Sequence, residues 1–292
     1  MKIGMTLPSF VVGVDGPTIR EWCRRIDDGP FSALAVGERV AYPSHDLVST
    51  LAYAAAATDR VRLVSTIAVL PTHDPVRLAK QAATIDVLSD GRLTLGVGVG
   101  GRDQDYAAVG ASTAARFARL DEQVEIMRGV WRGDVVVADV PPIGPTPVQP
   151  GGPPMLTASM GPKSLARSAR WADGLSGFDL APDPDAVART FDAVRIAWTK
   201  SGRSSAPWLS TSTWFALGDD APDRLSGYAR NYLSTFGDAA ASAMAGLCRL
   251  HDPGVLREVV ATLAETGCDE FILVPTTDDP TELDRLTAAL DA

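Results

Sequence analysis

The chain has 292 residues, of which 46% are hydrophobic and 22% are charged, and its net charge is −9 at pH 7. These fractions are ordinary for a globular protein and argue against disorder and fibrous repeats. The acidic balance argues against non-specific nucleic-acid binding, which requires a positive surface. The length suits one large α/β domain or two of about 150 residues.

The cysteines and the apolar runs indicate where the protein resides. Cys23, Cys248 and Cys268 lie far apart and form no CxxC pair, which predicts reduced, packed thiols. No apolar run approaches the roughly 20 residues of a membrane span. The first residues, MKIGMTLP, are typical of a strand rather than of a signal peptide. We therefore expect a cytoplasmic protein that binds neither nucleic acid nor a membrane.

Short apolar runs alternate with helix-length amphipathic segments along the first half of the chain. Asp46 and Asp74 stand where helix caps are expected. The predicted elements are a strand over 3–7, a helix over 17–28, a strand over 33–36, a helix over 47–57, a strand over 61–70, a helix over 75–88, a strand over 93–99 and a helix over 114–131.

A proline- and glycine-rich stretch, residues 135–154, then interrupts the alternation and predicts an excursion over the surface. The alternation resumes after it. The second half predicts strands over 155–158, 174–178, 209–217 and 270–274, and helices over 163–171, 185–200, 222–236, 254–266 and 282–290.

Eight strands, each followed by helix, predict parallel strands joined by helical crossovers. Eight such units in this length fit a closed barrel better than an open doubly wound sheet. We therefore predict an α/β fold with one domain over residues 1–292. It is a single-domain (β/α)8 TIM barrel with the Pro/Gly-rich excursion between the fourth and fifth units.

The run from Gly96 to Gly101 satisfies G-x-G-x-x-G after a strand, and Asp121 lies about 20 residues further on, as in a dinucleotide-binding fold. That fingerprint also requires a helix that opens on the last glycine, whereas residues 102–106 and Gly110 intervene. A glycine-lined strand end at a barrel mouth is the stronger interpretation, and an NAD(P)-dependent dehydrogenase is the weaker one.

Other local patterns indicate which kinds of binding site the chain contains. His45 and His251 give no metal-ligand spacing and no HExxH motif occurs, so no metal site is predicted. The loop that follows the fifth strand, residues 158–164, offers backbone amides, a hydroxyl, a helix start and Lys163. Such a group of donors is suited to bind a phosphate. On the seventh strand, Trp214 and Phe215 are candidate walls of a substrate pocket.

The segment Leu88–Arg92 leading into Leu95–Gly100, followed by Tyr106 and Gly110, resembles the luciferase-like monooxygenase superfamily. His73-Asp74-Pro75 and Met160-Gly161-Pro162 extend the resemblance along the chain. These proteins are flavin- or deazaflavin-dependent oxidoreductases with a (β/α)8 barrel. The resemblance implies the same fold here.

The resemblance also implies a cofactor site. Family members hold the flavin-type ring against a bulge in the third strand, often with a non-proline cis peptide, and the cofactor phosphate at the loop after the fifth strand. The matching candidates are Thr66, Ile67 and Ala68 at the bulge, Gly98 and Gly100 on the fourth strand, and Ala158, Ser159, Met160, Gly161 and Lys163 at the phosphate.

The candidate catalytic residues are Glu38, Arg39 and His73. Where many family members carry an acid followed by histidine, this chain has Glu38-Arg39, and Gly101 stands where the dehydrogenases carry glutamate. Both departures argue against a sugar-phosphate or alcohol dehydrogenase. Arg39 either stabilises an anionic ring or substrate group or pairs with Glu38 as structure. His73 is either a proton relay or a solvated loop residue.

The resulting functional prediction is an oxidoreductase or monooxygenase that uses coenzyme F420 or FMN on a small organic substrate at the barrel mouth. Only four of the 27 basic residues are lysines, a GC-rich signature that favours F420. A homodimer is expected and, with FMN, a separate flavin reductase. The rival is a non-catalytic flavin-binding paralogue. Loops 40–45 and 101–113 and the excursion are expected to shape the substrate pocket.

Overall fold

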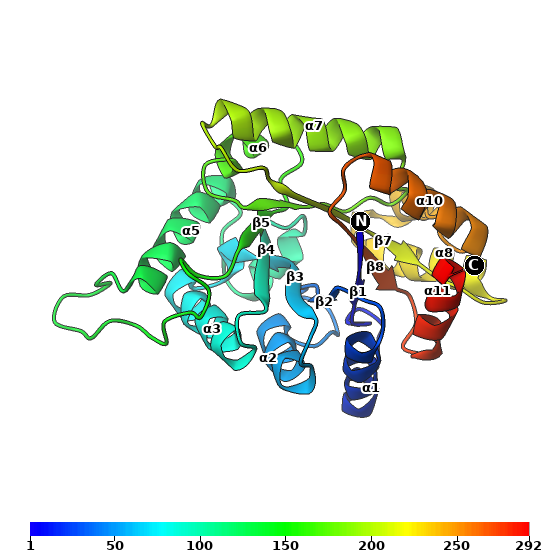
Figure 1. The fold of residues 1–292 in the computed structure, drawn as a ribbon, viewed down its shortest axis with the longest axis horizontal. Coiled ribbons are helices and arrows are strands. Elements are labelled where there is room, and N and C mark those ends of the chain that lie inside the picture. The colour runs from blue at the N-terminus through cyan, green and yellow to red at the C-terminus, as the bar shows by residue number, and fades with distance from the viewer. Residues whose placement is uncertain (292) are drawn as a thin grey trace.

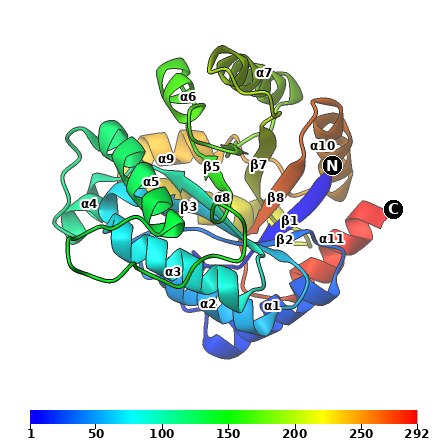
Figure 2. The ribbon, with the colours of Figure 1, turned by 60° about the vertical axis from the view of Figure 1, so that its left-hand side comes forward.

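The computed structural model describes residues 1–291. Its strands form one closed parallel barrel in the order β1 to β8, and the helices surround it (Figures 1 and 2). This confirms the predicted (β/α)8 barrel and rules out the doubly wound sheet of a dinucleotide-binding fold. The strands are β1 Lys2–Thr6, β2 Ala33–Val36, β3 Arg62–Val69, β4 Leu93–Gly98, β5 Met155–Thr157, β6 Gly174–Ser176, β7 Trp208–Phe215 and β8 Glu270–Pro275.

The helices follow the predicted order, with two additions that the sequence did not predict. A short helix, α4, follows β4, and α9 lies within the connection from β7 to β8. The helices are α1 Gly16–Asp28, α2 Leu47–Ala57, α3 Pro75–Leu88, α4 Asp103–Ala108, α5 Arg116–Arg132, α6 Pro162–Ser168, α7 Pro184–Lys200, α8 Ala221–Leu233, α9 Asp238–Ala245, α10 Pro253–Glu265 and α11 Thr281–Asp291.

Aspartate caps set the starts of several helices. The Asp46 carboxylate accepts a hydrogen bond from the Ser49 amide at 2.8 Å, and Asp74 accepts one from the Arg77 amide at the same distance. Asp183 repeats the arrangement at α7. Such a cap satisfies an amide that the helix leaves free and stabilises it by about 0.5–2 kcal/mol. The two predicted caps are thereby confirmed.

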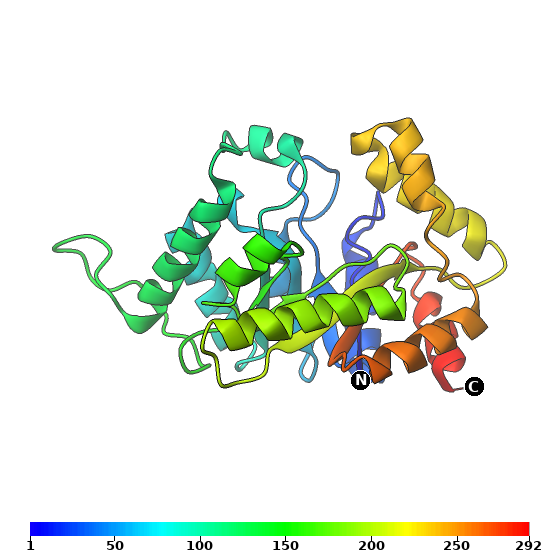
Figure 3. The same cartoon turned by 90° about the horizontal axis from the view of Figure 1, so that it is seen from above.

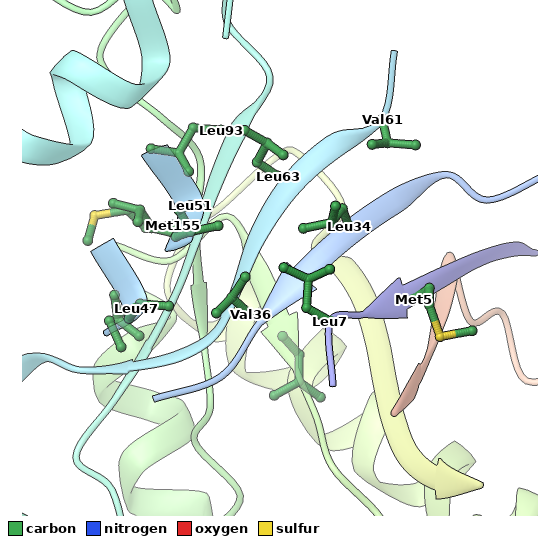
Figure 4. Close-up of a cluster of buried hydrophobic side chains, with 14 of the residues drawn as sticks. Met5, Leu7, Leu34, Val36, Leu47, Leu51, Val61, Leu63, Leu93 and Met155 are labelled. Carbon is green, nitrogen blue, oxygen red and sulfur yellow. The ribbon is translucent and has the colours of Figure 1, made fainter. Parts of the chain in front are cut away.

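The hydrophobic core lies mainly between the barrel and the helices. Figure 4 shows part of it, where Leu47 and Leu51 of α2 join Leu34, Leu63 and Leu93 of the strands. Cys23, Cys248 and Cys268 are free and buried, as predicted. Within residues 1–291, no helix has the length and apolar character needed to cross a bilayer.

An ion pair closes the N-terminal end of the barrel. Arg62, the first residue of β3, donates to the buried Glu270, the first residue of β8. The hydroxyl of Ser32 donates to the same carboxylate at 2.6 Å. These contacts pair the buried Glu270 carboxylate near the strand starts. Barrel enzymes carry their ligand sites at the opposite end, where the strands finish.

The Pro/Gly-rich excursion joins the end of α5 to the start of β5, and Figure 1 shows it projecting from the barrel. It is anchored where it returns. The amides of Val148 and Gln149 donate to the buried Asp86 carboxylate of α3, and the Gln149 side chain donates to the carbonyl of Leu93, the first residue of β4. The excursion therefore lies towards the N-terminal face of the barrel.

Candidate functional site

A cavity of about 550 Å³ lies at the C-terminal ends of the strands. Its lining includes Thr6 of β1, Thr66 of β3, Ser176 of β6, Trp214 of β7 and Val274 of β8. The volume is usual for a small-molecule site. In Figure 3, α9 (gold) and the segment around α4 (teal) lie on the upper edge, opposite the termini. Because barrel enzymes carry their chemistry at this face, the cavity is the candidate active site.

Strand β3 carries the bulge that the resemblance implied. Its pairing with β4 shifts register between Ser65 and Ala68, and the peptide bond between Thr66 and Ile67 is cis. Thr66 and Ile67 line the cavity, whereas Ala68 is fully buried outside the lining. The bulge therefore presents residues 66 and 67 at the cavity wall.

The glycines of β4 make room for this bulge. A Cβ at Gly96 would lie 2.2 Å from the Ser65 carbonyl oxygen, and a Cβ at Gly98 would lie 2.5 Å from Ile67 Cδ1. The first distance requires the β3 backbone to shift, whereas the second requires the Ile67 side chain to move. Gly98 and Gly100 do not themselves line the cavity. The glycine run therefore permits the close approach of two strands, and its contact with the cavity is indirect, through β3.

The loop after β5 reaches the cavity through Ala158 and Met160. Thr157 Oγ1 donates to Ser159 Oγ at 2.8 Å and accepts from the Ser159 amide at 3.2 Å, which fixes the turn. Gly161 caps α6, and the exposed Lys163 stands in its first turn. Among residues 1–291, the amides of Met160, Gly161, Lys163 and Ser164 donate to no backbone carbonyl.

Glu38 and His73 form a partly buried pair beside the cavity. The Glu38 carboxylate accepts from the Val69 amide at 2.6 Å and lies 2.8 Å from His73 Nε2. Burial alone would lower the pKa of His73, but the hydrogen bond and the charge of Glu38 raise it above its ordinary value. Neither residue lines the cavity. The pair ties the end of β2 to the segment that follows the bulge.

Arg39 is buried and does not pair with Glu38. Its Nε lies 3.5 Å from Asp105 Oδ2 of α4, and its guanidinium packs over the ring of Tyr42 at 4.7 Å. It lies next to the cavity rather than in its lining, behind the ring of Tyr232. The alternative in which Arg39 pairs with Glu38 is therefore wrong, because Glu38 is held by His73 instead.

The loop over 101–113 reaches the cavity through Arg102, as expected, whereas no residue from 40–45 lines it. Tyr232, Phe236 and Met244 also line the cavity and were not predicted. Tyr228, Tyr232 and Phe236 are spaced by four residues, and this helical stripe of aromatic side chains was the available signal. Trp214 lines the cavity as expected, whereas Phe215 lies in the core.

The expectation that the excursion shapes the pocket is wrong. The cavity lining takes no residue from 133–154. The physical reason is topological, because a segment that joins a helix end to a strand start lies at the face opposite the strand ends. The connection after β7, which carries α8 and α9, lines the cavity with Tyr232, Leu233, Phe236 and Met244.

The amino-acid sequence is similar to those of several known proteins. An uncharacterized protein of Mycobacterium tuberculosis is 33% identical over 167 residues, which cover 55% of this chain and 58% of that protein. An F420-dependent glucose-6-phosphate dehydrogenase of Nocardia farcinica is 30% identical over 212 residues, which cover 66% of this chain and 57% of that protein. The chain thus spans less than three-fifths of the length of these relatives.

Solved structures share the fold over almost the whole chain. Monooxygenase RslO1 from Streptomyces bottropensis superposes with a TM-score of 0.79 at 24% identity, covering 99% of this chain and 98% of that one. The oxygenating constituent of 3,6-diketocamphane monooxygenase from Pseudomonas putida, in complex with FMN, gives 0.71 at 15% identity, covering 98% and 95%. The family model described as luciferase-like monooxygenase matches residues 1–279, and the chain therefore belongs to that family.

Proposed function

We propose that this protein is a flavin- or deazaflavin-dependent oxidoreductase that acts on a small organic substrate in the cavity at the barrel mouth. The observation that carries the proposal is the β3 bulge, which presents Thr66 and Ile67 at the cavity wall. Family membership supports it, as do the relative named for F420 and the structural neighbour solved with FMN.

The residues present fit a flat ring with polar edges. Ile67 of the bulge offers apolar surface, and the buried Thr6 hydroxyl has no hydrogen-bond partner within residues 1–291. When bound, F420 would supply hydride transfer and FMN would supply hydride transfer or oxygen activation, while the protein contributes binding, orientation and exclusion of water. The free Thr6 hydroxyl is available to a ring carbonyl or ring nitrogen.

The loop after β5 is the proposed phosphate site. Its unpaired amides at Met160, Gly161, Lys163 and Ser164 lie around the start of α6, which follows the cavity-lining Ala158 in the chain. Backbone N–H groups of this kind bind phosphate oxygens, and Lys163 adds a positive charge. This position would hold the cofactor phosphate while the ring extends towards β3.

The three candidate catalytic residues are proposed in supporting roles. Glu38 and His73 hold the end of β3 and so keep the bulge in place. The Arg39 guanidinium adds positive charge beside the cavity. The expected homodimer and, with FMN, the separate flavin reductase remain predictions.

The test is titration of the purified protein with FMN and with F420, followed by fluorescence, with NADPH as a control ligand. Micromolar binding of one of the two, and turnover when its reduced form is mixed with a panel of acceptors or oxygen, is the expected result. Tight binding without turnover would favour the non-catalytic paralogue. Binding of NADPH alone would overturn the proposal.

A further inference from the structure

The candidate cavity is largely apolar and contains one cationic side chain. Phe10, Phe178, Trp214 and Phe236 contribute aromatic surface to its wall. Among the described residues that line it, Arg102 alone is charged. A cation in an apolar wall selects against other cations and favours an anion, since the low local dielectric strengthens the attraction.

The guanidinium of Arg102 is only partly satisfied by the protein. It lies 4.4 Å from the ring centre of Tyr232 and 5.5 Å from that of Phe236, and both rings line the cavity. Nη2 donates to the Tyr232 carbonyl at 3.4 Å, and the buried Nε finds no partner within residues 1–291. A guanidinium has five N–H donors, so most of its capacity is free.

A second arginine increases the positive charge at this place. Arg39 lies 5.3 Å from the same Tyr232 ring, and its side chain is 6% exposed. The neighbouring acid is Asp105, whose Oδ1 already accepts the amides of Val40 and Ala41. Asp105 therefore pairs with Arg39, whereas Arg102 forms no ion pair within residues 1–291, and burial lowers the pKa of Arg102. A bound anion would compensate the excess charge.

We propose that the substrate is an apolar organic anion whose carboxylate, or an oxyanion of similar size, binds to Arg102. Its apolar body would lie against Phe178 and Trp214, whose rings meet edge to face at 5.1 Å. This inference rests on the proposed function, because the same cavity is taken to hold the cofactor. It deepens that function by naming the class of substrate.

The experiment compares two probes of nearly equal shape, 2-naphthoate and 2-naphthamide, which differ in charge. Each is titrated calorimetrically into the protein with and without saturating cofactor. We expect naphthoate to bind about tenfold more tightly or better, as one charge-assisted hydrogen bond provides. Equal affinities, or no binding of naphthoate at millimolar concentration, would overturn the proposal.

Substitutions of Arg102 test whether this residue causes the preference for naphthoate over naphthamide. In Arg102→Gln the ratio of the two dissociation constants is expected to fall to about one, and Arg102→Lys is expected to restore part of it. The ratio is the informative quantity, because loosening of the Tyr232 contact would weaken both probes alike. The matched control is Arg77→Gln at an exposed position of α3, which should keep the preference. A preference that survives Arg102→Gln would overturn the assignment.

The cofactor phosphate is the other anion that Arg102 is placed to bind. FMN and riboflavin, or F420 and its phosphate-free chromophore, are titrated into the wild type and Arg102→Gln. We expect Arg102→Gln to bind all of them as the wild type does. A loss confined to the phosphorylated form would mean that Arg102 holds the cofactor phosphate, which overturns the proposal. Absence of all cofactor binding in the wild type would instead reject the proposed function, and the cofactor-free titrations would still test the anion site.

Discussion

His73 Nε2 lies 2.8 Å from Glu38 Oε1, and this contact is a proton-dependent link between the ends of β2 and β3. The pKa of His73 is raised, because the hydrogen bond and charge of Glu38 outweigh burial. The protonated form is therefore stabilised by folding. The contribution of protonated His73 to the free energy of unfolding is fully present below the ordinary histidine pKa of about 6.5. It is lost as pH rises through the higher pKa of the folded state.

This predicts a pH-dependent cost for His73→Gln. The loss in free energy of unfolding should be larger at pH 6 than at pH 8.5, as measured by urea denaturation at both values. His251→Gln is the control, since the His251 ring makes no hydrogen bond within residues 1–291. In the wild type, the NMR titration midpoint of the His73 ring should lie above 6.5 and fall in Glu38→Gln. An equal cost of His73→Gln at both pH values would contradict the assignment.

The glycines of β4 offer a matched pair of variants. In Gly96→Ala the new Cβ would lie 2.2 Å from the Ser65 carbonyl oxygen, so the β3 backbone must move. We expect a loss of about 1–3 kcal/mol in stability and weaker cofactor binding, as for overpacking. In Gly101→Ala the new Cβ meets nothing within 4 Å, and both quantities should stay near wild type. Thermal melting and cofactor titration measure both effects, and equal behaviour of the two variants would count against the bulge as the ring site.

The proposed phosphate site predicts a specific loss of cofactor affinity. Ser159→Ala combined with Lys163→Ala should weaken FMN or F420 binding by about 1–3 kcal/mol, the value of a charge-assisted hydrogen bond. Riboflavin, which lacks the phosphate, should bind unchanged. Lys200→Ala at the end of α7 removes an exposed lysine elsewhere and is the control. Unchanged dissociation constants for the phosphorylated cofactor would place the phosphate elsewhere.

Burial of the three thiols predicts their reactivity. Burial raises the pKa of Cys23 to about 12 and those of Cys248 and Cys268 to about 11. Because the thiolate is the reactive form, native protein at pH 8 should react slowly with Ellman's reagent. In denaturant all three should react at once. Rapid labelling of one thiol in the native protein would mean that its segment opens, and Cys248 in the loop after α9 is the one to examine.

The fold followed from local patterns, whereas the site depended on contacts between distant segments. Asp74-Pro75 marks a helix start and Leu93–Gly98 a strand by features of neighbouring residues alone. The position of the bulge at Thr66 and Ile67 came from the family resemblance, because its geometry depends on glycines in a different strand. Arg102 and Tyr232 meet across 130 residues, and no local pattern encodes such a contact.

The projecting part of the excursion is expected to contribute little to the cavity or to stability. Val135, Val136 and Val137 are exposed on the segment that projects from the end of α5, away from the strand ends. Replacing all three by serine should leave cofactor affinity unchanged and alter stability by no more than about 0.5 kcal/mol, as for surface positions.

The part of the excursion that leads back to β5 is expected to contribute more to stability. There the buried Asp86 carboxylate accepts hydrogen bonds from the amides of Val148 and Gln149 at 2.8 and 3.0 Å. Asp86→Ala leaves these donors without their acceptor and should cost about 1–3 kcal/mol or more. Urea denaturation and cofactor titration of both variants measure how each half of the excursion affects stability and cofactor affinity. A change in cofactor affinity in the triple serine variant would mean that the excursion reaches the cavity after all, against the topology of the barrel.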